Sequence, residues 1–150
     1  MRIIPATAGG GFGTKLDVSL QPLLGLAVLK TGKPCRMVFT RHESMVATTK
    51  RHPAAMRGSL AADADGRLVG MTFEGNFNTG AYASWGPTVA TRVPIHASGP
   101  YRVPHYFAEA HAIHTSGPVA GAFRGFGVPQ ATILQEILMD RLALDVGIAR

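Results

Sequence analysis

Two glycine- and phenylalanine-rich segments constrain the fold of this chain more than any other feature of its sequence. The first is AGGGFGTK, Ala8 to Lys15, and the second is GAFRGFGVPQ, Gly121 to Gln130. Glycine lets a backbone approach a ligand closely and adopt positive φ angles. Phenylalanine fits a solvated loop poorly, so at least one ring of the second segment should wall a pocket. We therefore expect two loops that form two walls of one ligand site.

The first segment does not fit the common phosphate-binding motifs. Its residue order, Gly13-Thr14-Lys15, differs from the Walker spacing, and the final glycine and acidic residue of the dinucleotide fingerprint are absent. A flexible strand-to-helix turn is the simpler alternative, although such a turn does not require Phe12 among its glycines. In the second segment, Arg124 supplies a planar fork of donors suited to phosphates, carboxylates or carbonyl oxygens.

Composition predicts one globular domain. The chain has 150 residues, of which 46% are hydrophobic and only 16% are charged, whereas disorder would need the opposite balance. So few charges suggest faces that meet other protein. The net charge of +6 comes from scattered basic residues, without the arginine-rich helix or aromatic-basic stripe that favours nucleic acid. We therefore assign the charge to a solvated surface or to steering of an anionic ligand.

The sequence lacks a ligand set for a protein-bound metal. Cys35 is the only cysteine, which excludes an intrachain disulfide, a thiolate zinc site and a cysteine-ligated iron–sulfur cluster within the chain. His111 and His114 lie three residues apart and would face opposite sides of a strand. The N-terminus does not resemble a signal peptide, and the apolar run 23–29 is too short to span a bilayer. We expect no membrane contact and a cytoplasmic location.

The order of the expected elements predicts an α+β fold with antiparallel strand pairs and a few packed helices. Pro22 should lie in the first turn of the first helix or kink it. The segment 62–66 has the composition of a hairpin turn. We expect strands at 2–5, 35–40, 54–62, 67–78 and 106–114, helices at 17–30, 88–95 and 129–145, and helical turns within 41–50.

Arg92 is a charge in an apolar neighbourhood, between Val89-Ala90 and Val93-Pro94. Buried there it would need a partner, and the alternative is a solvent-facing arginine on a short helix. Both alternatives remain open from the residues alone.

Several motifs, in order along nearly the whole chain, resemble the molybdenum-cofactor subunit of the xanthine dehydrogenase and aldehyde oxidase family. They are GGGFG, KTGKP, RHES, KRHP, SGPYRVPH and AFRGFG…PQ. The resemblance implies a molybdenum ion held by the dithiolene of a pterin, which needs no protein ligand to the metal. In this family the cofactor-binding residues would be Gly11, Phe12 and Gly13 in one loop and Ala122, Phe123 and Arg124 in the facing loop.

The resemblance also implies substrate contacts. Phe126 matches a ring that packs on a flat aromatic substrate, and Arg92 matches the arginine that binds a substrate oxygen in purine-oxidising members. Leu16 stands where those members carry a glutamate, so xanthine loses one polar contact. No cysteine occurs in 121–130, which argues against a carbon monoxide dehydrogenase of the copper–molybdenum type.

The family's general base, a glutamate, is expected outside this chain, so we expect no catalytic residue within it. We interpret residues 1–150 as part of the molybdopterin-binding domain of a larger subunit, inactive when expressed alone. Iron–sulfur clusters and FAD are expected on partner domains or subunits. The implied reaction is oxidative hydroxylation of a purine- or nicotinate-like N-heterocycle with water as the oxygen source. The alternatives are an aldehyde oxidoreductase of the same family and a non-catalytic basic domain that binds nucleic acid or an anionic cofactor.

Overall fold

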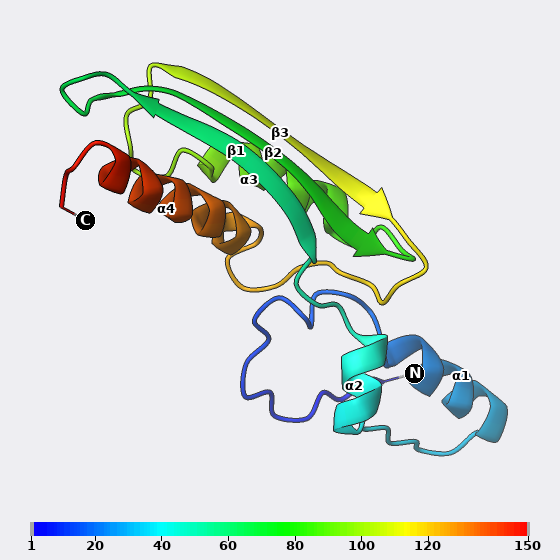
Figure 1. The fold of residues 1–150 in the computed structure, drawn as a ribbon. Coiled ribbons are helices and arrows are strands. Elements are labelled where there is room, and N and C mark those ends of the chain that lie inside the picture. Colours follow the sequence, from blue (N-terminus) through cyan, green and yellow to red (C-terminus); the bar gives the residue numbers. More distant parts are fainter. Residues whose placement is uncertain (1, 150) are drawn as a thin grey trace.

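The structure is a computed structural model that describes residues 2–149, and it has the expected α+β architecture (Figure 1). Its described elements are α1 (Gln21–Thr31), α2 (Arg41–Ala47), β1 (Ala54–Ala62), β2 (Leu68–Gly80), α3 (Gly86–His96), β3 (His105–His114) and α4 (Val128–Asp145). None of these helices is both long and apolar enough to cross a membrane.

The three strands form one mixed sheet in the order β1-β2-β3. β1 and β2 are the expected antiparallel hairpin, with Gly58 opposite Phe73. The expected fold had antiparallel strand pairs, but β3, expected as a further strand, runs parallel to β2. The reason is the connection between the two strands. α3 carries the chain back to the end of the sheet where β2 begins, as a crossover between parallel strands must.

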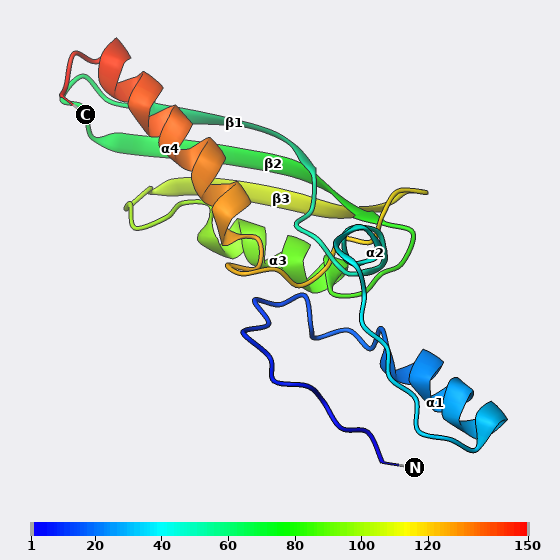
Figure 2. The ribbon, with the colours of Figure 1, turned by 90° about the horizontal axis from the view of Figure 1, so that it is seen from below.

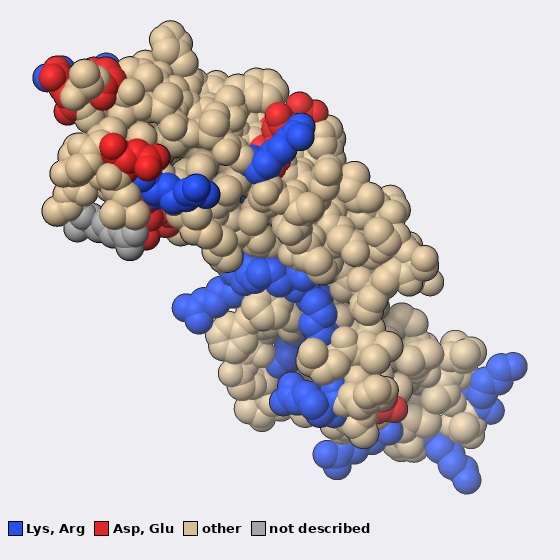
Figure 3. Space-filling model, in the orientation of Figure 1, with Lys and Arg blue, Asp and Glu red and all other residues tan. Residues whose placement is uncertain are grey.

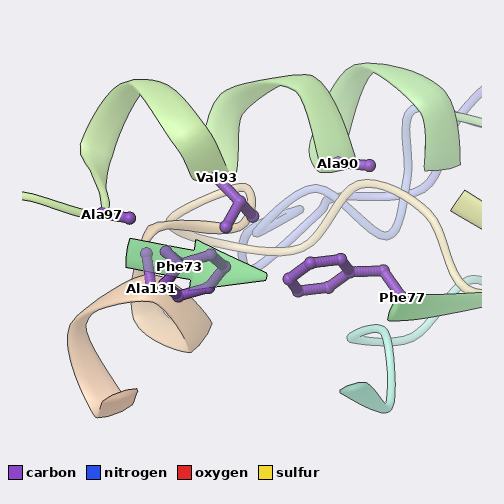
Figure 4. Packing of buried hydrophobic residues seen from close by; sticks show 6 residues of the cluster. All are labelled: Phe73, Phe77, Ala90, Val93, Ala97 and Ala131. Carbon is purple, nitrogen blue, oxygen red and sulfur yellow. The ribbon is translucent and has the colours of Figure 1, made fainter. Parts of the chain in front are cut away.

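The core lies between the sheet and two helices that cover the same face (Figure 2). Alternation along β2 directs Met71, Phe73 and Phe77 to this face, where they are buried. α3 packs on β3 and α4 packs on β1. In Figure 4, side chains of α3 project toward the two phenylalanine rings. The buried cluster consists of Phe73, Phe77, Ala90, Val93, Ala97 and Ala131.

Two expected strands, 2–5 and 35–40, are not strands in the structure. A strand is stabilised by its neighbours, and these segments make no ladder with any described residue. They belong to an N-terminal lobe with α1 and α2 that stands apart from the sheet (Figure 1). α1 begins at Gln21 rather than Asp17, with Pro22 in its first turn. α2 confirms the helical turns expected within 41–50.

α4 confirms the expected C-terminal helix, but its apolar side chains divide between two environments. Leu134 and Leu138 face β1 at Gly58, where a Cβ on that glycine would lie 3.3 and 3.2 Å from them. Ile133 and Ile137 are exposed by 56% and 52%. The helix therefore buries one part of its apolar surface against the sheet and presents the rest to its surroundings.

Candidate functional site

The two glycine–phenylalanine loops touch at Gly13. This residue has a φ of 96°, and a Cβ built on it would lie 2.8 Å from the carbonyl carbon and oxygen of Ala122 and from the nitrogen of Phe123. Real Cβ atoms do not approach a backbone so closely, so both the conformation and the contact require glycine. Figure 2 shows the N-terminal segment running beside the loop that precedes α4. The expectation that the loops are adjacent is confirmed.

The second loop is built from consecutive left-handed residues. Gly125, Phe126 and Gly127 have φ angles of 87°, 51° and 96°. Turn hydrogen bonds join them, from the Phe126 nitrogen to the Phe123 oxygen (2.8 Å) and from the Val128 nitrogen to the Gly125 oxygen (3.0 Å). Among the described residues, Phe12, Ser84 and Phe126 are those other than glycine with positive φ. Such strain in the two phenylalanines of facing loops is a feature that often marks a functional site.

Each phenylalanine of the two loops is paired with an arginine. The distances from guanidinium carbon to ring centroid are 4.7 Å for Arg51–Phe123, 5.7 Å for Arg92–Phe126 and 5.7 Å for Arg124–Phe12. Trp85 also meets the Phe126 ring edge-on, with centroids 6.2 Å apart. The loop junction therefore combines aromatic faces with three guanidinium groups, which favours planar and anionic ligands.

Charge is distributed unevenly over the chain. Residues 1–53 contain eight Lys or Arg and two Asp or Glu, whereas residues 54–150 contain seven of each kind. The whole net charge of +6 is thus carried by the part of the sequence that includes the first loop. In Figure 3, blue side chains gather where the N-terminal lobe meets the sheet. A positive potential at this junction would attract an anionic ligand.

The loops also offer free backbone donors. The N–H groups of Gly11, Gly13, Phe123, Arg124 and Gly125 make no hydrogen bond to any residue in 2–149. Several N–H groups on neighbouring loop segments form the kind of surface that holds oxyanions. His, Cys, Asp and Glu side chains form no cluster of three or more that could hold a metal ion within the described chain. The free N–H groups therefore suit an anionic ligand.

The structure brings together all the site residues expected from the sequence. Gly11, Phe12 and Gly13 lie in the first loop, where Gly13 touches Ala122 and Phe123. The Arg124 guanidinium lies over the Phe12 ring, and Arg92 lies over Phe126. Arg92 is exposed, so the solvent-facing alternative describes its environment, although its guanidinium has an aromatic partner. Leu16 is 59% exposed.

The KRHP motif is recognisable in the sequence, but the sequence does not predict that its residues Arg51 and His52 support the second loop. Arg51 donates from Nη2 to the carbonyl oxygen of Arg124 and from Nη1 to Oε1 of Gln130, at 3.2 Å. His52 is 3% exposed, and its Nε2 lies 3.3 Å from the Thr79 hydroxyl. Burial, and then the charge of Arg51, lower the pKa of His52 below its usual value of 6.5. These partners lie 27 to 79 residues apart in the chain, so no local sequence pattern predicts their contacts.

Comparison with known proteins points to one family. Residues 1–150 match the profile of the molybdopterin cofactor-binding domain. The chain is 48% identical over 147 residues to the nicotinate dehydrogenase large molybdopterin subunit of Eubacterium barkeri, which covers 98% of this chain and 35% of that relative. It is 40% identical over 148 residues to a probable xanthine dehydrogenase subunit of Bacillus subtilis, covering 99% of this chain and 20% of that relative. The chain therefore spans about a third or less of these two relatives.

Solved structures agree in fold. The aldehyde oxidoreductase of Desulfovibrio desulfuricans matches with a TM-score of 0.89 and 29% identity, over 94% of this chain and 16% of that chain. The quinoline 2-oxidoreductase of Pseudomonas putida matches with a TM-score of 0.85 and 31% identity, over 94% of this chain and 18% of that chain. The four helices and the mixed sheet described above thus correspond to part of a known domain, and the expected α+β class is confirmed.

Proposed function

Because the chain belongs to the molybdopterin cofactor-binding domain family of molybdenum hydroxylases, we propose that it forms one wall of the molybdenum site in a larger subunit. The proposed reaction is oxidative hydroxylation of an aromatic N-heterocycle, with water as the source of oxygen. The observation that carries the proposal is the contact of Gly13 with the Ala122–Phe123 backbone. This contact joins the two loops that resemble the family's cofactor loops into one surface.

The residues present fit such a cofactor. When bound, it supplies a redox-active molybdenum already ligated by the pterin dithiolene, which agrees with the absence of a protein ligand cluster among the described residues. Gly11, Phe12 and Gly13, together with Ala122, Phe123 and Arg124, would hold it largely through their free N–H groups. The neighbouring guanidinium groups would balance its negative charge. The general base, the iron–sulfur clusters and FAD would come from other parts of the subunit or from partners.

The substrate side of the site favours a flat, anionic ring. The Phe126 ring offers an aromatic face, and Arg92 lies 5.7 Å from its centroid. Stacking and a charge-assisted hydrogen bond are the interactions that a nicotinate-like carboxylate ring would use. Leu16, apolar and exposed, gives no polar contact to a dioxygenated purine. The similarity to the Eubacterium barkeri nicotinate dehydrogenase subunit supports the same substrate class.

Aldehyde oxidation is the second candidate. It is favoured by the close structural similarity to the Desulfovibrio desulfuricans aldehyde oxidoreductase. An aldehyde needs neither the Arg92 guanidinium nor a stacking surface, so the two candidates differ in what they require of this chain. A non-catalytic basic domain has weaker support, because net charge is a less specific signal than the paired loops.

Substrate screening of the complete enzyme separates the candidates. We predict turnover of nicotinate-like rings in preference to xanthine and simple aldehydes. Arg92→Ala should lower kcat/KM for the ring carboxylate by about 10- to 100-fold, the loss that a hydrogen bond to a charged group represents. Arg57→Ala is the matched control, since this exposed arginine pairs with Glu74 on the outer face of the sheet. Preferred turnover of aldehydes, unchanged by Arg92→Ala, would contradict the proposal.

A further inference from the structure

Arg51 links the second loop and the first turn of α4 to the segment before β1. Its Nη2 donates to the Arg124 carbonyl oxygen, its Nη1 donates to Gln130 Oε1, and its guanidinium carbon lies 4.7 Å from the centroid of Phe123. Gln130 in turn donates from Nε2 to the His52 carbonyl oxygen at 3.3 Å. The Arg51 side chain thus contacts the Phe123 ring, the Arg124 backbone and Gln130 in the first turn of α4.

The hydrogen bond to Arg124 fixes the orientation of a peptide plane. No cis peptide bond occurs in the described chain, so the C=O of Arg124 and the N–H of Gly125 point in opposite directions. With the carbonyl held toward Arg51, the Gly125 N–H is directed away from it. That N–H has no hydrogen-bond partner among residues 2–149. Gly125 has a φ of 87°, a conformation in which the peptide could otherwise reorient at little steric cost.

The arrangement requires arginine rather than any cation. The planar fork reaches two acceptors at once and stacks on the Phe123 ring, whereas a lysine ammonium is a single point charge on a flexible stem. The side chain is also partly removed from solvent, which strengthens hydrogen bonds that would be weak on an open surface.

We propose that Arg51 is a positioning residue: through the Arg124 carbonyl and the Phe123 ring it holds the second loop, and the free Gly125 N–H, in the geometry that receives the cofactor. This inference rests on the proposed function of the loops. It adds a residue outside both glycine–phenylalanine segments to the machinery of the site.

The test uses the complete holoenzyme and four proteins: the parent, Arg51→Ala, Arg51→Lys and the control Arg57→Ala. Molybdenum and pterin contents, the rate of cofactor release after dilution, the electron paramagnetic resonance signal of molybdenum and the melting temperature are measured. Arg51→Ala should release the cofactor about 10- to 100-fold faster and change the resonance signal, since hydrogen bonds from a charged donor are lost. Low millimolar guanidinium should slow release from Arg51→Ala and leave the parent unchanged. Arg57→Ala should match the parent.

A release rate and resonance signal equal to the parent's in Arg51→Ala would overturn the inference, even if the melting temperature falls, because a purely structural role predicts that result. Where Arg51→Ala does not accumulate as folded protein, Arg51→Lys decides: intermediate release and an altered signal support the inference, and parent-like values overturn it. A parent enzyme that contains no molybdenum and no pterin would overturn the proposed function itself, and this inference with it.

Discussion

Gly13 must be glycine for two reasons: its backbone is left-handed, and it touches the backbone of the facing loop. Its φ is 96°, and any Cβ would lie 2.8 Å from atoms of Ala122 and Phe123. We predict that Gly13→Ala separates the two loops and lowers cofactor content of the complete subunit by at least about tenfold. The strained φ alone costs about 1–2 kcal/mol, and the contact adds to it.

Two other glycines serve as controls for Gly13→Ala. A Cβ on Gly9, in the same loop, meets nothing within 4 Å, so Gly9→Ala should retain the cofactor. Gly32 has a φ of 65° with open space around it, so Gly32→Ala tests backbone strain without a clash. Molybdenum and pterin analysis of the three variants checks the prediction. Equal cofactor content in Gly13→Ala and Gly9→Ala would show that the loop contact is not needed.

His52 should make stability depend on pH in a known direction. Burial lowers its pKa below 6.5, and its Nδ1 is buried without a hydrogen-bond partner among the described residues, so the fold favours the neutral ring. Below about pH 6.5 the unfolded chain takes up a proton that the folded protein does not, until the lower folded pKa is reached. The free energy of unfolding should therefore fall as pH falls through this window.

Urea unfolding of the protein between pH 7.5 and pH 5 measures the effect of His52. These bounds are chosen to lie on either side of the usual imidazole pKa, about 6.5. His52→Gln should flatten the dependence, because the variant lacks the buried imidazole. A parent and a His52→Gln variant with the same slope would show that His52 does not titrate differently in the fold.

Among the elements, the packing of α4 on β1 depends on Gly58. A Cβ there would lie 2.6 Å from the Thr72 carbonyl oxygen, and at 3.3 and 3.2 Å it would be closer to Leu134 and Leu138 than ordinary van der Waals contact. We predict that Gly58→Ala lowers the free energy of unfolding by about 1–3 kcal/mol, as overpacking does. Gly70→Ala is the control, because its nearest neighbour, the His105 oxygen, would lie at an ordinary 3.5 Å. Denaturant midpoints that do not differ between the two variants would contradict the packing argument.

The sequence predicts elements well where the signal is local. The β1–β2 hairpin follows from alternation and a turn at 62–66, and α4 follows from helical periodicity. The direction of β3 could not be predicted in the same way, since it depends on the path of α3 across the sheet. The segments 2–5 and 35–40 have strand-like composition, but composition does not supply the neighbour that a strand requires.

The site also has features that local sequence predicts and features that depend on long-range contacts. Its two loops could be paired from composition, because glycine and phenylalanine together are unusual in a solvated loop. The KRHP motif contains Arg51, but its contacts could not be predicted, since its partners Arg124 and Gln130 are 73 and 79 residues distant. Contacts of this kind become visible only when the sheet and α4 have placed the second loop beside the segment before β1.

For the whole molecule, the notable feature is exposed apolar surface. α1 exposes Leu23, Leu26 and Leu29, and α4 exposes Ile133 and Ile137. Contiguous exposed apolar surface marks interaction sites, and uncovered it promotes association. We predict that residues 1–150 expressed alone self-associate and have no detectable oxidoreductase activity, because the proposed base and electron-transfer centres lie outside them.

Sedimentation and substrate assays of the purified 150-residue chain check this prediction. Replacing Ile133 and Ile137 together with glutamine should reduce association without restoring activity, and Thr132→Ser is a neutral control at an exposed neighbouring position. A monomeric chain that turns over substrate would contradict both the interaction surface and the proposed placement of the base and electron-transfer centres outside residues 1–150.

If the two glycine–phenylalanine loops form one wall of a molybdenum–pterin site, as proposed, the metal must lie beside both of them. Anomalous diffraction at the molybdenum edge, from crystals of the complete subunit, locates the metal without assuming any structure for its surroundings. We predict a single peak beside the junction of Gly13 with Ala122 and Phe123, facing the free N–H groups of the two loops. A peak against another face of this domain, or crystals of active enzyme without molybdenum, would contradict it.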